Sequence, residues 1–151
     1  KAPWNKVPFP LLIQPPVNLS YIETENTVSL VRDWEFLNDR QVFWSWKWDI
    51  NGKILNRIPF IRRLKWREFV DVKGFWGQLT DKNNPTKNAS DNLIYRFPVD
   101  SHIMSNKPYW EVEAGIHNIF NLISIGYVRR LTYNYPGVSK WGIRFDFQAS
   151  F

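Results

Sequence analysis

The chain has 151 residues, a formal net charge of +6 and no cysteine. The length allows one domain with a sizeable core, and the lack of cysteine excludes a disulfide framework, a thiolate metal site and a cysteine nucleophile. No apolar run approaches the roughly 18 residues of a membrane-spanning helix, so a helical membrane protein is excluded. Aromatic residues make up 17% of the chain, including nine tryptophans, and this favours a β-barrel whose aromatic side chains gather at membrane interfaces.

The beginning of the chain predicts little regular structure. Residues 1–20 contain five of the ten prolines, and proline lacks the N–H group that a central strand donates. We expect an irregular apolar turn or a sheet edge here, followed by a weak strand within residues 19–30. The chain starts with Lys1 and shows no signal peptide. A secreted barrel needs one, so we expect that it has been removed or lies upstream.

Five later segments alternate apolar and polar residues, which predicts strands near residues 41–50, 68–79, 109–116, 124–134 and 140–151. One face of these strands is predicted to contact lipid, through Trp44, Trp46, Trp48, Trp76, Trp110, Tyr127 and Leu131. The opposite face is predicted to line a barrel lumen, through Lys47, Asp49, Asp71, Lys73, Glu111, Glu113, Arg130, Arg144 and Asp146. Arg129 falls on the apolar face, where a long side chain can extend to the interface.

Turns and loops separate these strands. Asn51-Gly52 and Tyr135-Pro136-Gly137 carry turn signals, and residues 81–90 form a polar loop. Residues 54–66 are basic and apolar and are expected to form a short amphipathic helix at a membrane surface. Residues 117–122 are expected to be a short connector.

The last strand carries the clearest membrane signal. Its apolar face is formed by Trp141, Ile143, Phe145, Phe147 and Phe151. The stretch has the roughly 9–11 residues of a tilted strand that crosses a bilayer. Its aromatic final residue resembles the C-terminal insertion signal of bacterial outer-membrane β-barrels. With Phe151 at the periplasm, residues 80–107 and 135–137 would be extracellular, and residues 51–66 and 117–122 periplasmic.

Five strands and a weaker sixth are too few for a barrel, because the smallest single-chain barrels have about eight and an open edge is not stable in lipid. The fold predicted for residues 1–151 is therefore all-β, the C-terminal portion of a larger antiparallel outer-membrane barrel. Assembly with other chains is the alternative.

The charged face has two interpretations, a channel lining or ligand contact, and ion pairs across strands in a packed interior. Its mixed signs favour ion pairs. Glu111 and Glu113 share a face, as carboxylates of glycosidases do, but no substrate cleft is indicated. His102 and His117 lie on separate connectors, so we predict no catalytic residues, no metal site and no cofactor. The basic residues are spread along the chain, which argues against a nucleic-acid partner.

Several stretches together resemble one known family. They are residues 36–40 (Phe-Leu-Asn-Asp-Arg), 56–68, 115–120, 127–133 and 141–145. The family comprises Bacteroidota outer-membrane proteins of unknown function with a carboxypeptidase-regulatory-like domain ahead of a C-terminal β-barrel. The resemblance implies an N-terminal periplasmic domain that this chain lacks, and it carries over no catalytic residues. TonB-dependent transporters share that domain type, but no plug sequence is present here.

These observations predict a non-enzymatic protein of the bacterial outer membrane, a structural or accessory subunit of a transport or assembly complex. The alternatives are the C-terminal strands of a TonB-dependent-type nutrient transporter, and a soluble aromatic-rich β-protein that binds nucleic acid or glycan. The expected partners are outer-membrane lipid, the barrel-assembly machinery and other outer-membrane or periplasmic proteins. The sequence identifies neither a cargo nor the total number of strands.

Overall fold

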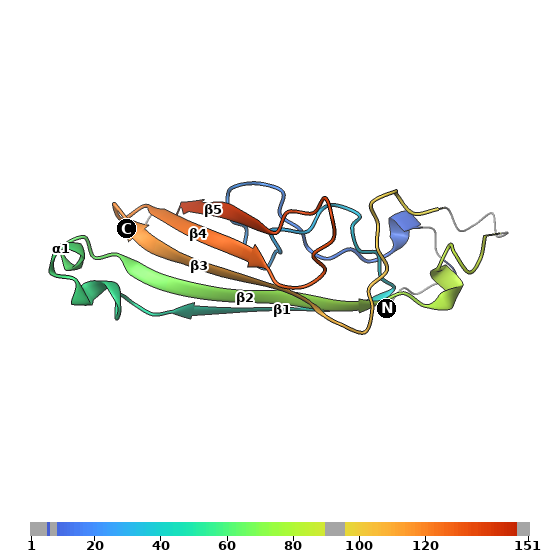
Figure 1. The fold of residues 1–151 in the computed structure, drawn as a ribbon, viewed down its shortest axis with the longest axis horizontal. Coiled ribbons are helices and arrows are strands. Elements are labelled where there is room, and N and C mark those ends of the chain that lie inside the picture. The colour runs from blue at the N-terminus through green and yellow to red at the C-terminus, as the bar shows by residue number, and fades with distance from the viewer. Residues whose placement is uncertain (1–5, 7–8, 90–95, 148–151) are drawn as a thin grey trace.

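A computed structural model describes residues 6, 9–89 and 96–147, and within them the chain forms one antiparallel sheet of five strands (Figure 1). The strands follow the chain in the order β1-β2-β3-β4-β5. Their bounds are Arg40–Asp49 (β1), Arg67–Gln78 (β2), Tyr109–Ile119 (β3), Ile123–Arg130 (β4) and Trp141–Phe147 (β5). The all-β antiparallel prediction is confirmed, and the described sheet is open rather than closed into a barrel.

The largest differences from the predicted strands lie around β4. This strand ends at Arg130 instead of residue 134. Tyr133 has a φ of 56°, which is incompatible with the extended backbone of a strand. The Tyr133 hydroxyl donates to the Lys107 carbonyl oxygen, and its ring packs edge-on against Phe36. Tyr133 therefore turns into the protein. β3 extends through His117 to Ile119, with a register shift after Ile116, so part of the expected connector is strand.

Pairing between the strands places each alternating set on a single face. Trp46, Val72, Val112, Arg129 and Trp141 are partners across all five strands. The neighbouring row, one residue further along, contains the charged partners Lys73, Glu111 and Arg130. Since successive side chains of a strand point to opposite faces, one face is mainly apolar and the other is rich in charge. We call them the outer face and the inner face.

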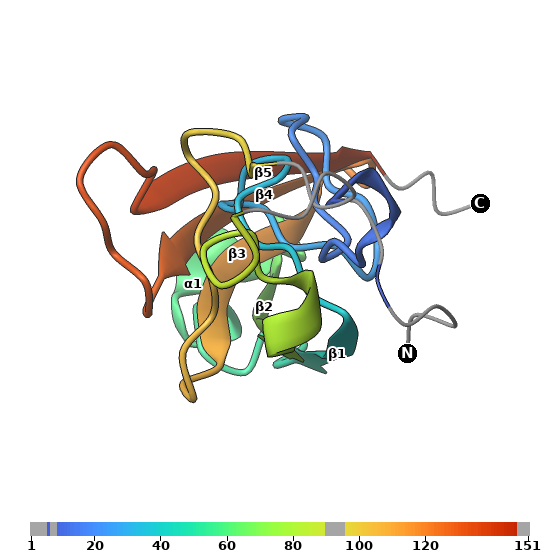
Figure 2. The same ribbon diagram turned by 90° about the vertical axis from the view of Figure 1, so that its right-hand side faces the viewer.

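Residues 9–39 form an N-terminal arm that packs on the inner face. The arm has one short 3₁₀ helix, η1 (Phe9–Leu11), and otherwise isolated bridges, so the weak strand expected within residues 19–30 does not form. At the edge of the sheet, the Phe145 N–H donates to the Tyr21 carbonyl oxygen over 2.8 Å. Figure 2 looks along the strands and shows the sheet curved around the arm.

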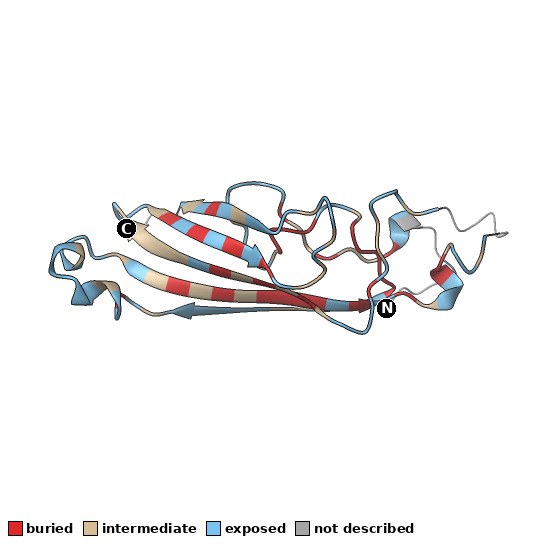
Figure 3. Cartoon of the chain, viewed as in Figure 1, coloured by how far each residue is buried: buried red, intermediate tan, exposed pale blue. Residues whose placement is uncertain are grey.

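The hydrophobic core lies between the arm and one end of the inner face. Its larger cluster consists of Val28, Val31, Phe36, Phe75, Met104 and Tyr109. A second cluster joins Leu12 and Leu37 of the arm to Leu79. Arm, inner face and the loop after β2 thus share one core, and the buried residues in Figure 3 follow this layer.

The connectors lie at the two ends of the sheet (Figure 1). Between β1 and β2 the chain makes a tight turn, with φ values of 56° at Asn51 and 75° at Gly52. Two short helices follow, η2 (Leu55–Arg57) and α1 (Pro59–Arg62). The amphipathic helix expected over residues 54–66 is thus reduced to one turn of α-helix. The longer connector at the other end contains η3 (Asp81–Asn83). Among the described residues, no helix is long and apolar enough to cross a membrane.

Candidate functional site

The outer face exposes a continuous apolar surface over all five strands. Trp46 and Trp48 on β1 are 64% and 59% exposed, and Phe147 on β5 is 62% exposed. The other exposed large side chains of this face are Val42, Trp76, Ile125, Tyr127, Trp141, Ile143 and Phe145. Exposed apolar patches beyond a few hundred Å² are rare on soluble monomers and mark binding or membrane surfaces. This face is the first candidate site.

Gly74, toward the C-terminal end of β2 on the outer face, brings two tryptophans together. It is the pairing partner of both Trp44 on β1 and Trp110 on β3. A Cβ atom at Gly74 would lie 2.6 Å from the indole nitrogen of Trp44, so only glycine leaves room for that ring. The two indoles meet over the glycine with centroids 4.9 Å apart. They are the least exposed of the predicted lipid-facing tryptophans because they cover each other.

The remaining predicted outer residues also lie on this side. Tyr127 and Trp141 stack with centroids 6.1 Å apart, and the four described residues of the expected insertion signal all belong to β5. Leu131 is exposed but follows the end of β4. Phe151 lies outside the described residues.

The inner face carries the second candidate site, a buried charged cluster. Six of the nine residues predicted to line a lumen are buried: Asp71, Lys73, Glu111, Glu113, Arg130 and Arg144. Their burial comes from the arm, whose Glu23 and Glu35 add two carboxylates to the cluster. Burying a charge is costly unless it is paired and hydrogen-bonded, so the partners of each residue decide what the cluster does.

Lys73 lies among three carboxylates. Its Nζ is 2.9 Å from Glu23 Oε1 of the arm, 3.4 Å from Asp71 Oδ2 and 3.6 Å from Glu113 Oε2. Asp71 and Glu113 are direct partners across β2 and β3, and like charges opposite each other destabilise a sheet. The lysine offsets this repulsion and joins the arm to the sheet.

Arg130 forms a second, bidentate ion pair with Glu35 of the arm. Its Nη1 donates to Glu35 Oε2 over 3.3 Å, and its Nη2 donates to Glu35 Oε1. The guanidinium also lies 5.0 Å from the centroid of the Tyr109 ring. Planar pairing with a carboxylate and stacking on an aromatic ring are the two interactions that suit arginine better than lysine.

Charged side chains of the sheet also hold the backbone of the arm at Ser29 and Leu30. Glu111 accepts hydrogen bonds from the Ser29 N–H at 2.8 Å and the Leu30 N–H at 3.3 Å. Arg144 donates to the Ser29 carbonyl oxygen, and Arg130 Nη1 donates to the Leu30 carbonyl oxygen over 3.0 Å. The N–H and carbonyl groups of Ser29 and Leu30 thus form hydrogen bonds with side chains instead of with a neighbouring strand.

The other three inner-face residues lie beyond the arm, toward the end of the sheet that carries α1. Lys47 and Asp49 are exposed and Asp146 is half-buried. The Lys47 Nζ lies 4.8 Å from the centroid of the Phe69 ring, and Asp49 Oδ1 lies 3.3 Å from Nε2 of His117. The inner face therefore has a packed half and an open half. Among the described residues, no group of three or more histidine and acidic side chains is arranged to hold a metal ion.

Glu23 and Glu35 were not identified from the sequence. The arm showed no periodicity that placed it on the sheet, so its two acids had no predicted partners. The available signal was a surplus of apolar residues in a proline-rich segment, because residues such as Leu12, Val28 and Leu37 need a surface to bury against. Comparison of the chain with known protein families, curated proteins and solved structures found no match.

Proposed function

We propose that the chain is part of a non-enzymatic outer-membrane β-barrel whose outer face contacts lipid, and that the protein is a structural or accessory subunit of a transport or assembly complex. The observation that carries this proposal is the inverted polarity of the sheet. Aromatic and aliphatic side chains occupy the exposed outer face, whereas ion pairs occupy the buried inner face. A barrel in a bilayer needs an apolar outside and admits a polar inside.

Aromatic residues occur along the whole length of the outer face. Aromatic and aliphatic side chains share the pairing rows: Trp46 and Trp141 lie in one row with Val72 and Val112, and Trp48 lies in the next row with Val70 and Ala114. An outward-facing apolar band that includes aromatic side chains is typical of membrane barrels. Arg129 lies in the same row as Val72 and Val112, and its long side chain can extend along the sheet toward a headgroup layer.

Five strands do not close a barrel, so this proposal includes further strands, from upstream in the same protein or from another chain. The resemblance to Bacteroidota outer-membrane proteins supports the first source. In either case the arm fills the interior beside these strands. A packed interior supports a structural role over an open solute path, because Lys73 and Arg130 are both paired with carboxylates of the arm.

Ala114→Lys tests lipid contact directly. Ala114 is exposed at the middle of β3 on the outer face. In water this change would alter the free energy of unfolding by less than about 0.5 kcal/mol. In a bilayer a lysine at mid-depth costs about 2–4 kcal/mol. We therefore expect a marked loss of membrane-inserted, heat-modifiable protein, measured by flotation with vesicles and by gel mobility before and after heating.

Asn106→Lys is the matched control, since it adds the same charge to an exposed loop residue and should leave insertion unchanged. A wild-type protein that stays in the aqueous phase, or an Ala114→Lys variant that inserts normally, would contradict the proposal. Aqueous partition would favour the alternative of a soluble β-protein.

A further inference from the structure

The connector between β1 and β2 carries basic residues without acidic ones, whereas the rest of the chain contains both signs. Residues 51–67 include no acidic residue and six basic ones: Lys53, Arg57, Arg62, Arg63, Lys65 and Arg67. The formal net charge of the whole chain is also +6, so elsewhere acidic and basic residues are balanced. This local excess is a feature of one end of the sheet, next to α1 (Figure 1).

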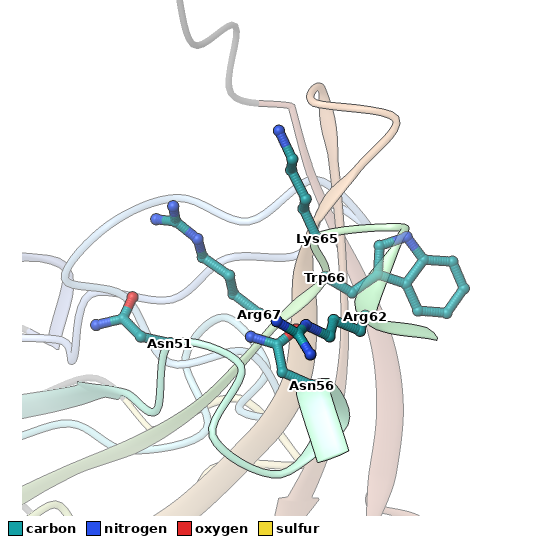
Figure 4. A pocket seen from close by; sticks show the side chains of 6 residues that line it. All are labelled: Asn51, Asn56, Arg62, Lys65, Trp66 and Arg67. Carbon is teal, nitrogen blue, oxygen red and sulfur yellow. The ribbon is translucent and has the colours of Figure 1, made fainter. Parts of the chain in front are cut away.

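Three of these cations border an open pocket of about 390 Å³. Its lining residues are Asn51, Asn56, Arg62, Lys65, Trp66 and Arg67, and Figure 4 shows them on the connector and the first residue of β2. None of the three cations forms an ion pair with a described residue. The next acidic residue, Glu68, accepts hydrogen bonds from the N–H groups of Ile54 and Leu55 instead.

The chemistry of this lining matches a phosphate group. Arginine presents parallel N–H donors that fit two oxygens of a phosphate, and lysine adds a compact point charge. The amide of Asn56, which also lines the pocket, supplies a further N–H donor.

Exposed apolar side chains on the same connector indicate where that phosphate comes from. Ile54 is 60% exposed and Phe60 is 80% exposed, and Ile58 and Leu64 are exposed as well. Basic and apolar side chains mixed on one exposed segment are typical of the membrane interface, where the former meet headgroups and the latter enter the acyl boundary. A site for soluble phosphate would not need the apolar residues.

We propose that this pocket binds the phosphate of an anionic phospholipid headgroup, with Arg62 and Arg67 as its main donors and Lys65 as supporting charge. The inference rests on the proposed function, because it requires β1 and β2 to end at a membrane interface. Phe60 and Trp66 would then anchor the connector in the headgroup layer. The site fixes the depth of this end of the sheet in the bilayer.

The test uses the full chain reconstituted in phosphatidylcholine vesicles that contain trace spin-labelled phosphatidylglycerol or phosphatidylcholine. Electron spin resonance gives the relative association of the two lipids with the protein. The wild type is expected to prefer phosphatidylglycerol by about threefold to tenfold at low salt. The triple variant R62Q/K65Q/R67Q should bind both lipids equally, and R62K/R67K, which keeps the charge, should retain most of the preference.

The control K87Q/K107Q/K140Q removes the same charge from exposed lysines at the opposite end of the sheet and should keep the wild-type preference. Equal preference in the wild type and R62Q/K65Q/R67Q, or an equal loss in the control, would overturn the site. Loss of the preference in millimolar inorganic phosphate would also overturn it, by assigning the pocket to soluble phosphate.

Flotation with pure phosphatidylcholine vesicles separates the two proposals. A wild type that does not float contradicts the proposed function and the lipid site together. A wild type that floats but shows no preference for phosphatidylglycerol contradicts the lipid site alone. The triple variant should float like the wild type. If it does not, the single variant Arg67→Gln replaces it in the lipid measurement. Arg67→Gln should then show a smaller preference for phosphatidylglycerol than the wild type, and an unchanged preference would overturn the site.

Discussion

At the scale of single residues, the buried cluster depends on a glycine at a position that has no room for a side chain. Gly126 pairs with Gly115 on β3 and Arg144 on β5. A Cβ atom at this position would lie 1.9 Å from Oε1 of Glu113. The glycine therefore gives the Glu113 carboxylate its place beside Lys73.

Gly126→Ala should consequently destabilise the protein by about 1–3 kcal/mol, because the added methyl group displaces a buried carboxylate. The measurement is the free energy of unfolding in urea, taken in a double-mutant cycle with Glu113→Ala. Once the carboxylate is gone, the methyl group has space and its cost should fall below about 1 kcal/mol. Equal costs in both backgrounds would show that the contact with Glu113 is not the cause.

Lys73→Met should be among the most damaging substitutions in the chain. It keeps the apolar stem of the side chain but removes the charge shared by Glu23, Asp71 and Glu113. Breaking a buried ion pair costs about 3–5 kcal/mol because the partner charge is left uncompensated. Lys47→Met on the exposed half of the same face removes only a contact with the Phe69 ring and should cost less than about 1 kcal/mol, and a similar loss for both would refute the special role of Lys73. Unfolding in urea measures both values.

Residue-level prediction from the sequence succeeded where the period of two was unbroken. Trp46 and Lys73 were assigned to opposite faces from alternation alone, and pairing places them so. The prediction from alternation failed for Tyr133, whose positive φ turns it toward the core. It also failed for Glu23 and Glu35. A partner 50 or 95 residues away, as Lys73 and Arg130 have, leaves no trace in a local pattern.

At the scale of elements, the arm and the sheet depend on each other. Ser29 and Leu30 have their N–H groups bound by Glu111 and their carbonyl oxygens bound by Arg144 and Arg130. The arm has no strand of its own, so these side chains replace the ladder that a sheet would provide. This explains why charged residues recur at inner positions of β3, β4 and β5.

Glu111→Leu should release this part of the arm, because leucine of similar size accepts no hydrogen bond. We expect amide hydrogen exchange at Ser29 and Leu30 to accelerate by at least about tenfold, which corresponds to the roughly 1.5–3 kcal/mol of a hydrogen bond to a charged group. The Ile13 amide, which donates to the Asn38 carbonyl oxygen at the other part of the arm, is the internal reference and should change little. Uniform acceleration at all three amides would indicate global unfolding instead.

At the scale of the whole molecule, the number of strands restricts how the sheet is completed. With five antiparallel strands in sequence order, β1 and β5 run in the same direction. A closed antiparallel barrel then needs an odd number of further strands. Identical copies joined from β5 to β1 would pair in parallel, and two copies joined β1 to β1 would point in opposite directions across the membrane. Under the proposed function, strands of a different sequence complete the barrel.

The same topology divides the connectors between two sides, which gives the last prediction. Ser139, between β4 and β5, and Asn106, between β2 and β3, lie at one end of the sheet, while Leu122 and Lys53 lie at the other. All four are exposed, and the chain contains no cysteine, so each substitution by cysteine introduces a unique label site. With the end of β5 at the periplasm, the first pair faces outward and the second pair faces the periplasm.

Intact cells that express the full chain are treated with a membrane-impermeant maleimide, and the same reagent is applied after lysis as the reference for full labelling. Ser139→Cys and Asn106→Cys should react in intact cells, whereas Leu122→Cys and Lys53→Cys should react only after lysis. Labelling of both pairs from outside would contradict a membrane-spanning sheet, and the reversed pattern would keep the sheet but invert it. Inversion would place the basic connector against the outer leaflet, whose lipids also carry phosphate, so the orientation decides which lipid the pocket around Arg62 and Arg67 meets.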